Sequence, residues 1–299
     1  MHHFIFPSQN NWISSGSSTV TNESFKNQNF GKDQILEIEK LFFNNFFHHQ
    51  SRALIQFSGT NFTAMSQSIV DGKITNPQFF LKLYEISGND KYSDNYTLAI
   101  QPLSQSWVEG TGKFGDIPKN IIGCSWENRN NIINGSKTIW DNSGGDVLSV
   151  SQSTQAFANE SSDVEVDVTD MVNMWLGSQS DNNGMLIKIS GSQETDESTF
   201  CNLKFFSRNT HTIYPPRLEV RWDDSSYSST GSLNQLTSSG LVDNHLYCRG
   251  LQESYKENDR IRFRIGSRKK FIQKTFTKSV HISSGSFIPE GSGSYAIKD

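Results

Sequence analysis

The chain has 299 residues, of which 34% are hydrophobic, 12% aromatic and 19% charged. No stretch approaches the roughly 18 apolar residues of a transmembrane helix, so no membrane association is expected. With 21 Phe, 8 Tyr and 6 Trp, the chain is also unlike a disordered protein, which is poor in aromatic residues. Ser and Asn together occupy 69 positions. This composition is typical of a globular, loop-rich, mostly β protein.

The formal net charge of −4 is unevenly distributed along the chain. The last segment, residues 245–299, holds 11 basic and 5 acidic residues, a net charge of +6. The remaining residues hold 16 basic and 26 acidic residues, a net charge of −10. A basic tail can bind nucleic acid, but we expect this one to dock onto a neighbouring protein subunit.

Apolar and polar residues alternate along most of the first 222 residues, which is the pattern of half-buried strands. Turn-forming sequences such as Asn134-Gly135 and Gly144-Gly145 separate the strands. Short strands at regular spacing predict an all-β protein with an antiparallel, jelly-roll-like β-sandwich. The expected strands cover residues 53–57, 79–84, 96–103, 164–168, 184–189, 203–206 and 217–222.

One short helix is predicted, over residues 169–177. Thr169 can act as its N-cap, and Met171, Val172 and Trp175 fall on one face. Gly177 closes the helix. We expect it to cover one end of the sandwich.

The chain is expected to change character after the sandwich, which covers residues 1–222. Residues 223–240 are rich in Ser and have the composition of a linker. Residues 241–299 then form a small, basic second β domain, with strands expected at 260–265 and 274–282. A domain this small is marginally stable alone, so we expect a partner to complete it.

No catalytic motif was found in the sequence, so no enzyme activity and no catalytic residue is predicted. The patterns of nucleophile elbows, zinc proteases, P-loops and dinucleotide-binding turns are all missing. Glu165 and Asp167 share one strand face, but they alternate with valines and are interpreted as a solvated face rather than an acid pair. Cys124, Cys201 and Cys248 are far apart and are expected to be reduced and buried.

Cofactors are not expected, although one loop resembles part of a calcium site. Asp181-Asn-Asn-Gly184 has the right composition but lacks the later bidentate Glu, and is more simply a hairpin turn. A structural calcium elsewhere among the Asp- and Asn-rich loops stays an alternative. Trp126 and Trp140 are candidate glycan contacts, because aromatic rings stack on sugar faces; the alternative is that tryptophans of this region belong to the core.

Several segments, in their order along residues 1–222, resemble the DNRLRE-type β-sandwich, which is related to one class of carbohydrate-binding modules. The segments that resemble motifs of that family are residues 29–38, 51–57, 80–84, 106–110, 167–175, 183–184, 206–209 and 216–220. The chain departs from the family pattern at Cys124-Ser-Trp126, which leads into an Asn-rich insertion, residues 127–145. A family-like ligand site at that end is therefore in doubt.

The fuller arrangement, a sandwich followed by a basic β segment, is similar to virion structural proteins of T4-like tailed phages that infect marine bacteria. This resemblance implies a non-enzymatic component of the neck, tail or fibre region, assembled in the host cytoplasm and located in the virion. It also implies other virion proteins as partners and a homo-oligomer within the particle. The candidate partner-docking residues are Arg260, Arg262, Arg264, Arg268, Lys269 and Lys270.

Two alternatives remain open. The protein could be a carbohydrate-binding module that recognises a surface glycan of the host. It could also be a polysaccharide lyase or glycosidase, since this sandwich accompanies such enzymes, although the chain is short for both parts.

Overall fold

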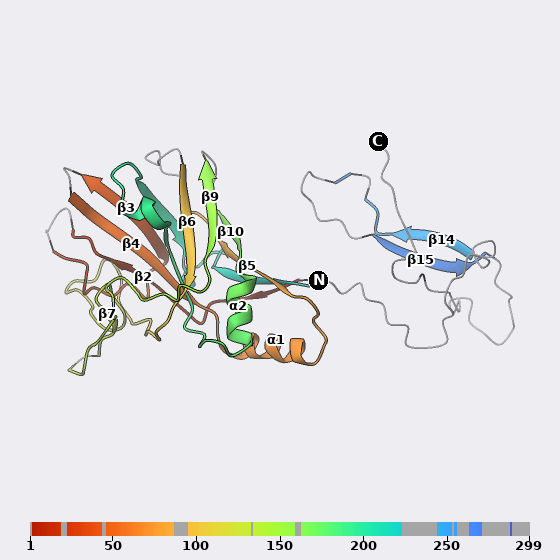
Figure 1. The fold of residues 1–299 in the computed structure, drawn as a ribbon, viewed down its shortest axis with the longest axis horizontal. Coiled ribbons are helices and arrows are strands. Elements are labelled where there is room, and N and C mark those ends of the chain that lie inside the picture. The colour runs from red at the N-terminus through yellow and green to blue at the C-terminus, as the bar shows by residue number, and fades with distance from the viewer. Residues whose placement is uncertain are drawn as a thin grey trace. The chain divides into compact units, whose positions relative to one another are not determined.

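The computed structural model describes residues 2–18, 23–43, 46–86, 95–132, 134–158, 163–222, 244–252, 254–255, 263–270 and 288. The chain divides into two compact units, residues 1–224 and 225–299, each of which is described by itself (Figure 1). The predicted linker, 223–240, and the predicted strand 274–282 lie outside the described residues.

The first unit is an antiparallel β-sandwich, as predicted. Its smaller sheet has the strand order β1 (His2–Ile5), β13 (Arg217–Arg221), β5 (Gln78–Leu83) and β10 (Val164–Asp167). Its larger sheet has the order β12 (Cys201–Phe206), β3 (Ile35–Phe43), β4 (Phe46–Gln56), β11 (Met185–Ile189), β6 (Asn95–Pro102) and β9 (Ser153–Ala158). In addition, β2 (Gln9–Ser14) pairs with β4.

The main core lies between the two sheets and follows from the alternation in the sequence. In β10, Val164 and Val166 are buried while Glu165 and Asp167 are exposed. Phe79, Leu81 and Leu83 of β5 point inward in the same way, and all of these apolar residues join one buried cluster. Burial of each large apolar side chain contributes about 1.5–3 kcal/mol, so the sandwich has a substantial core.

The helix predicted over residues 169–177 is confirmed as α2 (Thr169–Leu176), and Met171, Val172 and Trp175 are its buried residues. The predicted N-cap is wrong, because the residue at that position is Val168. The Thr169 hydroxyl accepts a hydrogen bond from the Phe79 backbone N–H instead, at 2.9 Å, and so joins α2 to β5.

The prediction of a single helix is also wrong, because α1 (Thr60–Val70) is a second one. Its sequence is rich in Thr, Ser and Asn, which are weak helix formers, so composition gave no sign of it. Phe62, Met65 and Ile69 recur at helical spacing and pack against the main core. Within the described part of the chain, no helix has the length and apolar character needed to span a membrane.

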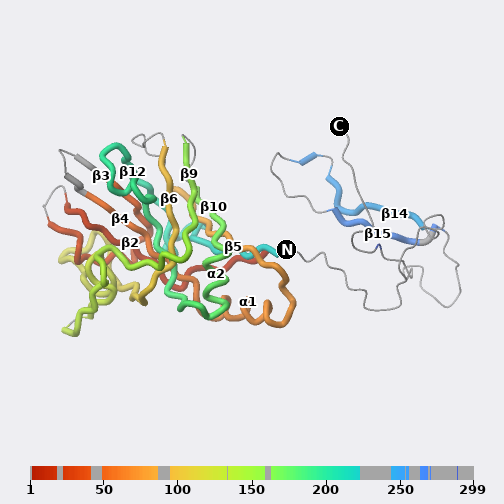
Figure 2. Tube along the Cα trace, viewed as in Figure 1, coloured from red at the N-terminus to blue at the C-terminus, as the bar shows by residue number. Residues whose placement is uncertain are grey.

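A third layer covers the outer face of the larger sheet. Leu54 of β4 and Leu186 of β11 point away from the main core, because their neighbours in the chain point into it. They pack with Trp107, Trp126 and Trp140, which come from the long connection between β6 and β9. Figure 2 shows this yellow-green segment against β2 and β4; its only regular structure among the described residues is the pair β7 (Asn128–Asn130) and β8 (Thr138–Ile139).

A buried lysine fixes the short 3-10 helix η1 (Gly191–Glu194) and the turn after it to the sheet. Lys40 of β3 is 1% exposed and donates hydrogen bonds to the backbone carbonyls of Gln193 and Asp196. Its ammonium also lies 2.8 Å from the Asp196 carboxylate. Burial raises the pKa of Asp196, but hydrogen bonds from Lys40 and Thr199 outweigh it and hold that pKa well below its ordinary value.

We predict that Asp196→Asn lowers the free energy of unfolding by about 1–2 kcal/mol at neutral pH, since it leaves the Lys40 ammonium without its counter-ion and the pair is partly screened by solvent. Because folding lowers the pKa of Asp196, its carboxylate stabilises the fold at pH values above the ordinary pKa of 3.8, and this stabilisation is lost as the carboxylate becomes protonated at lower pH. The difference in free energy of unfolding between the wild type and the variant should therefore shrink below pH 3.8. Urea unfolding at several pH values measures it. The control is Glu197→Gln at an exposed position, and equal stabilities of the two variants at neutral pH would contradict the prediction.

Candidate functional site

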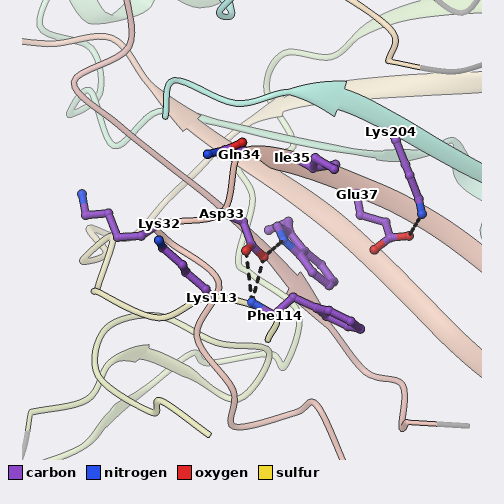
Figure 3. Close-up of a pocket in the computed structure, with 9 residues that line it drawn as sticks. Lys32, Asp33, Gln34, Ile35, Glu37, Lys113, Phe114 and Lys204 are labelled. Carbon is purple, nitrogen blue, oxygen red and sulfur yellow. Dashed lines mark hydrogen bonds and ion pairs between the residues drawn. The ribbon is translucent and has the colours of Figure 1, made fainter. Parts of the chain in front are cut away.

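A groove of about 410 Å³ opens on the sandwich where β3, β12 and the loop before β3 meet the loop around Phe114 (Figure 3). It is lined by Trp12, Lys32, Asp33, Gln34, Ile35, Glu37, Lys113, Phe114 and Lys204. The residues thus come from four separate parts of the chain. None of them was singled out by the sequence analysis.

Asp33 holds the aromatic side of the groove together. Its carboxylate accepts hydrogen bonds from the Trp12 indole N–H and from the Phe114 backbone N–H, both at 3.0 Å. Trp12 in turn stacks on Phe30, with ring centroids 3.8 Å apart. Burial raises the pKa of Asp33 in spite of these bonds. Phe114, which this arrangement holds in place, is 55% exposed and lines the groove.

Glu37 forms the opposite side of the groove, on the outer face of β3, where Glu39 also lies outside the groove lining. Both point away from the core because Leu36, Ile38 and Lys40 between them are buried. The Glu37 carboxylate lies 3.4 Å from the Lys204 ammonium, and Glu39 accepts a hydrogen bond from the Asn202 side chain at 3.0 Å. Burial raises the pKa of both carboxyl groups, and the neighbouring Glu37 charge adds to the effect on Glu39, whose pKa reaches about 7.

The groove therefore combines one exposed aromatic ring with fixed hydrogen-bonding groups of both charges. Asp33 and Glu37 are already held by groups of the protein, so their evident role is to shape the groove. Such a surface suits a polar ligand with one apolar face, because the ring can stack while the rim forms hydrogen bonds.

The two tryptophans predicted as glycan contacts lie elsewhere and are buried. Trp126 is 7% exposed and Trp140 is 2% exposed, both in the third layer. The Trp140 indole N–H donates to the Ser125 carbonyl at 2.9 Å, and the Arg52 guanidinium covers the Trp126 ring at 4.8 Å. Neither ring presents a free face to a sugar, so the structure supports the alternative that they belong to the core.

The partner-docking prediction falls on the second unit. Its described strands, β14 (Asn244–Arg249) and β15 (Arg264–Lys269), form an antiparallel pair. β15 overlaps the strand predicted at 260–265 at Arg264 and Ile265. Arg260 and Arg262 lie outside the described residues. Arg264, Arg268 and Lys270 are exposed, and Lys269 pairs through its backbone with Asn244.

The pairing register places most of the cations on one side of the hairpin. Residues directly opposite each other in an antiparallel pair share a face, and successive residues alternate. The pairs His245–Arg268 and Arg249–Arg264 therefore share a face with Tyr247. We call His245, Tyr247, Arg249, Arg264 and Arg268 the basic face. The other face carries Leu246, Cys248 and Ile265, all exposed.

The cysteine prediction is correct at two of three positions. Cys124 and Cys201 are free and buried, and burial raises the pKa of each thiol to about 12, so both stay protonated. Cys248 is free but exposed, on β14 of the two-stranded sheet that the described residues of the second unit form.

The loop compared with a calcium site is not a hairpin turn, since it connects α2 to β11. Its Asn182 side chain donates to the Phe57 carbonyl and its Asn183 carbonyl accepts from Trp107, so the loop is tied to its neighbours. No group of three or more His, Cys, Asp or Glu side chains within the described ranges is placed to hold a metal ion.

Comparison with known proteins adds no assignment: no family model matches the chain, and no curated protein is similar to it.

We predict that Glu39→Gln stabilises the protein at high pH. Because folding raises this pKa from 4.5 to about 7, wild-type stability should fall as pH rises between those values, where the unfolded chain releases the proton first. The free energy of unfolding of the variant should exceed that of the wild type by on the order of 1–3 kcal/mol at about pH 8 and should be almost equal to it at about pH 4. Thermal unfolding of both proteins at the two pH values measures the difference, and a pH-independent difference would contradict it.

Proposed function

We propose that this protein is a non-enzymatic structural component of a tailed-phage virion, which assembles through protein–protein contacts. The proposed assembly role rests on one observation: the hairpin formed by β14 and β15 has exposed residues on both of its faces. Leu246 is 44% exposed and Ile265 is 55% exposed on one side, while the basic face lies on the other. The phage setting rests on the fuller arrangement, a sandwich over residues 1–222 followed by a basic β segment, which resembles virion structural proteins of T4-like tailed phages.

An isolated two-stranded hairpin is marginally stable in water, and like charges directly opposite each other weaken it further. Arg249 and Arg264 form such a pair. Among the described residues, the Arg249 guanidinium lies 5.2 Å from the centre of the Tyr247 ring, which carries no charge to offset the pair. A neighbouring subunit that supplies carboxylates and apolar surface would stabilise the hairpin, which is the expected property of an assembly element.

If the basic face docks onto the particle, Arg264→Glu with Arg268→Glu should reduce incorporation of the protein into virions by about tenfold or more, because attraction becomes repulsion. The matched control is Lys73→Glu with Lys137→Glu, which changes the net charge equally at exposed positions of the sandwich. Quantitative mass spectrometry of gradient-purified particles measures incorporation. A wild-type protein that never appears in particles would refute the virion proposal itself.

A second candidate function is glycan binding, and the groove of Figure 3 is the observation that favours it. The Phe114 ring is the exposed aromatic group there, with Lys32, Lys113 and Glu37 at its sides. The groove takes the place of Trp126 and Trp140 as the candidate glycan site, because both tryptophans are buried.

For this second candidate, Phe114→Ala should abolish binding on a glycan array, because stacking supplies about 1 kcal/mol or more to weak sugar contacts. Phe6→Ala, at a residue that is 49% exposed elsewhere on the sandwich, is the control and should leave binding unchanged. Absence of any signal above background for the wild-type protein would remove the candidate.

A further inference from the structure

An acidic strip lies on the outer face of β10, an edge strand of the smaller sheet. Asp163, just before the strand, and Glu165 and Asp167 within it are all exposed, while the valines between them are buried. Asp170 in the first turn of α2 continues the same exposed segment. We call Asp163, Glu165, Asp167 and Asp170 the acidic strip.

The strip is held in a defined conformation by its own fold. The Asp163 carboxylate accepts a hydrogen bond from the Glu85 backbone N–H at 2.7 Å, and the Asp167 carboxylate accepts one from the Thr169 N–H at 2.8 Å. Glu165 pairs with Arg221 and lies 3.4 Å from Lys82. Side chains that are already ordered lose little conformational freedom when they bind, so the strip is prepared for a cationic partner.

The acidic strip and the basic face have the same spacing. Asp163 and Asp167 are four residues apart, as are Arg264 and Arg268 in β15. At about 3.4 Å per residue, each pair of charges is separated by roughly 14 Å along its strand. Two extended surfaces with matching spacing and opposite charge can pair at both ends at once.

We propose that the basic face of one copy docks onto the acidic strip of a second copy of this chain. The inference rests on the proposed assembly function and names one of its contacts. A head-to-tail contact of this kind joins two different surfaces, so it can build a ring or a continuing array instead of a closed pair.

Charge favours a second copy over nucleic acid as the occupant. Outside the basic segment the chain carries a net charge of −10, so a neighbouring sandwich both attracts the tail and supplies fixed carboxylates. An acidic body would repel the phosphates of a nucleic acid that approached the same hairpin.

Sedimentation velocity of the full chain over a range of protein concentrations tests the proposal. We expect reversible association at about 50 mM salt that weakens at least tenfold at about 500 mM salt, because the contact is electrostatic. Two variants should each be monomeric: Asp163→Lys with Asp167→Lys in the strip, and Arg264→Asp with Arg268→Asp in the hairpin. The control, Lys73→Glu with Lys137→Glu, should associate like the wild type.

Mixing the two monomeric variants is the decisive step. Their reversed surfaces are complementary to each other, so the mixture should regain association to within about threefold of the wild type, which a merely misfolded variant could not do. Far-UV circular dichroism of each variant checks that both are folded before mixing.

Three results would overturn the inference: a wild type that stays monomeric at low salt, association that neither variant affects, or a mixture that stays monomeric although both variants are folded. A monomeric wild type that binds a short DNA duplex in an anisotropy titration would assign the basic face to nucleic acid. If the hairpin variant is also lost from purified particles while the wild type is monomeric in solution, the proposed function stands and only the partner named here is wrong.

Discussion

The larger sheet is buried on both of its faces along β2, β4 and β11, and most other features of the sandwich depend on this. Ala53 and Ile55 point into the core between the sheets, while Leu54 points into the third layer. Met185, Leu186 and Ile187 divide in the same way. The outer face of the larger sheet therefore carries apolar residues such as Leu54 and Leu186. The connection between β6 and β9 must stay folded over that face to keep these residues out of contact with water.

This constraint explains why Trp126 and Trp140 are structural. The third layer has little regular hydrogen bonding of its own, so large rings and their polar anchors hold it in place. Arg52 contributes from β4: it contacts the Trp126 ring, donates to the Gly144 carbonyl at 2.7 Å, and pairs with Glu194 at 2.8 Å. One side chain thus connects the third layer to η1, and Lys40 fixes the turn after η1 from β3.

The surfaces left free by this packing are the ones available for function. Apart from Trp12, which belongs to the main core, the groove beside Phe114, the acidic strip on β10 and the basic face of the hairpin are built from residues outside the buried clusters. Their carboxylates have different surroundings. Burial raises the pKa of Glu37 in the groove, whereas Arg221 and Lys82 outweigh burial and lower the pKa of Glu165 on the strip. A glycan and a neighbouring copy would therefore occupy separate places on the sandwich.

Local patterns in the sequence were sufficient for β4, β5, β6, β10, β11, β12, β13 and α2, because alternation of period two and a clustered apolar helix face each indicate burial directly. The same patterns did not predict β1, β2 or β9. They were insufficient for α1, whose polar composition conceals three well-spaced apolar residues, and for the extent of the third layer. The runs Ala53-Leu-Ile55 and Met185-Leu-Ile187 do indicate burial on both faces, but they do not tell which segment covers them.

The sequence by itself determined the all-β class, the α2 helix and the separation of charge between an acidic body and a basic tail, since these are properties of neighbouring residues. Only the tertiary structure decided that Trp126 and Trp140 are core residues, that Trp12, Asp33, Glu37 and Phe114 share one groove, and that the hairpin cations gather on one face. Those outcomes depend on the pairing register and on contacts between residues that are well over one hundred positions apart, such as Glu37 and Lys204, which no local pattern encodes.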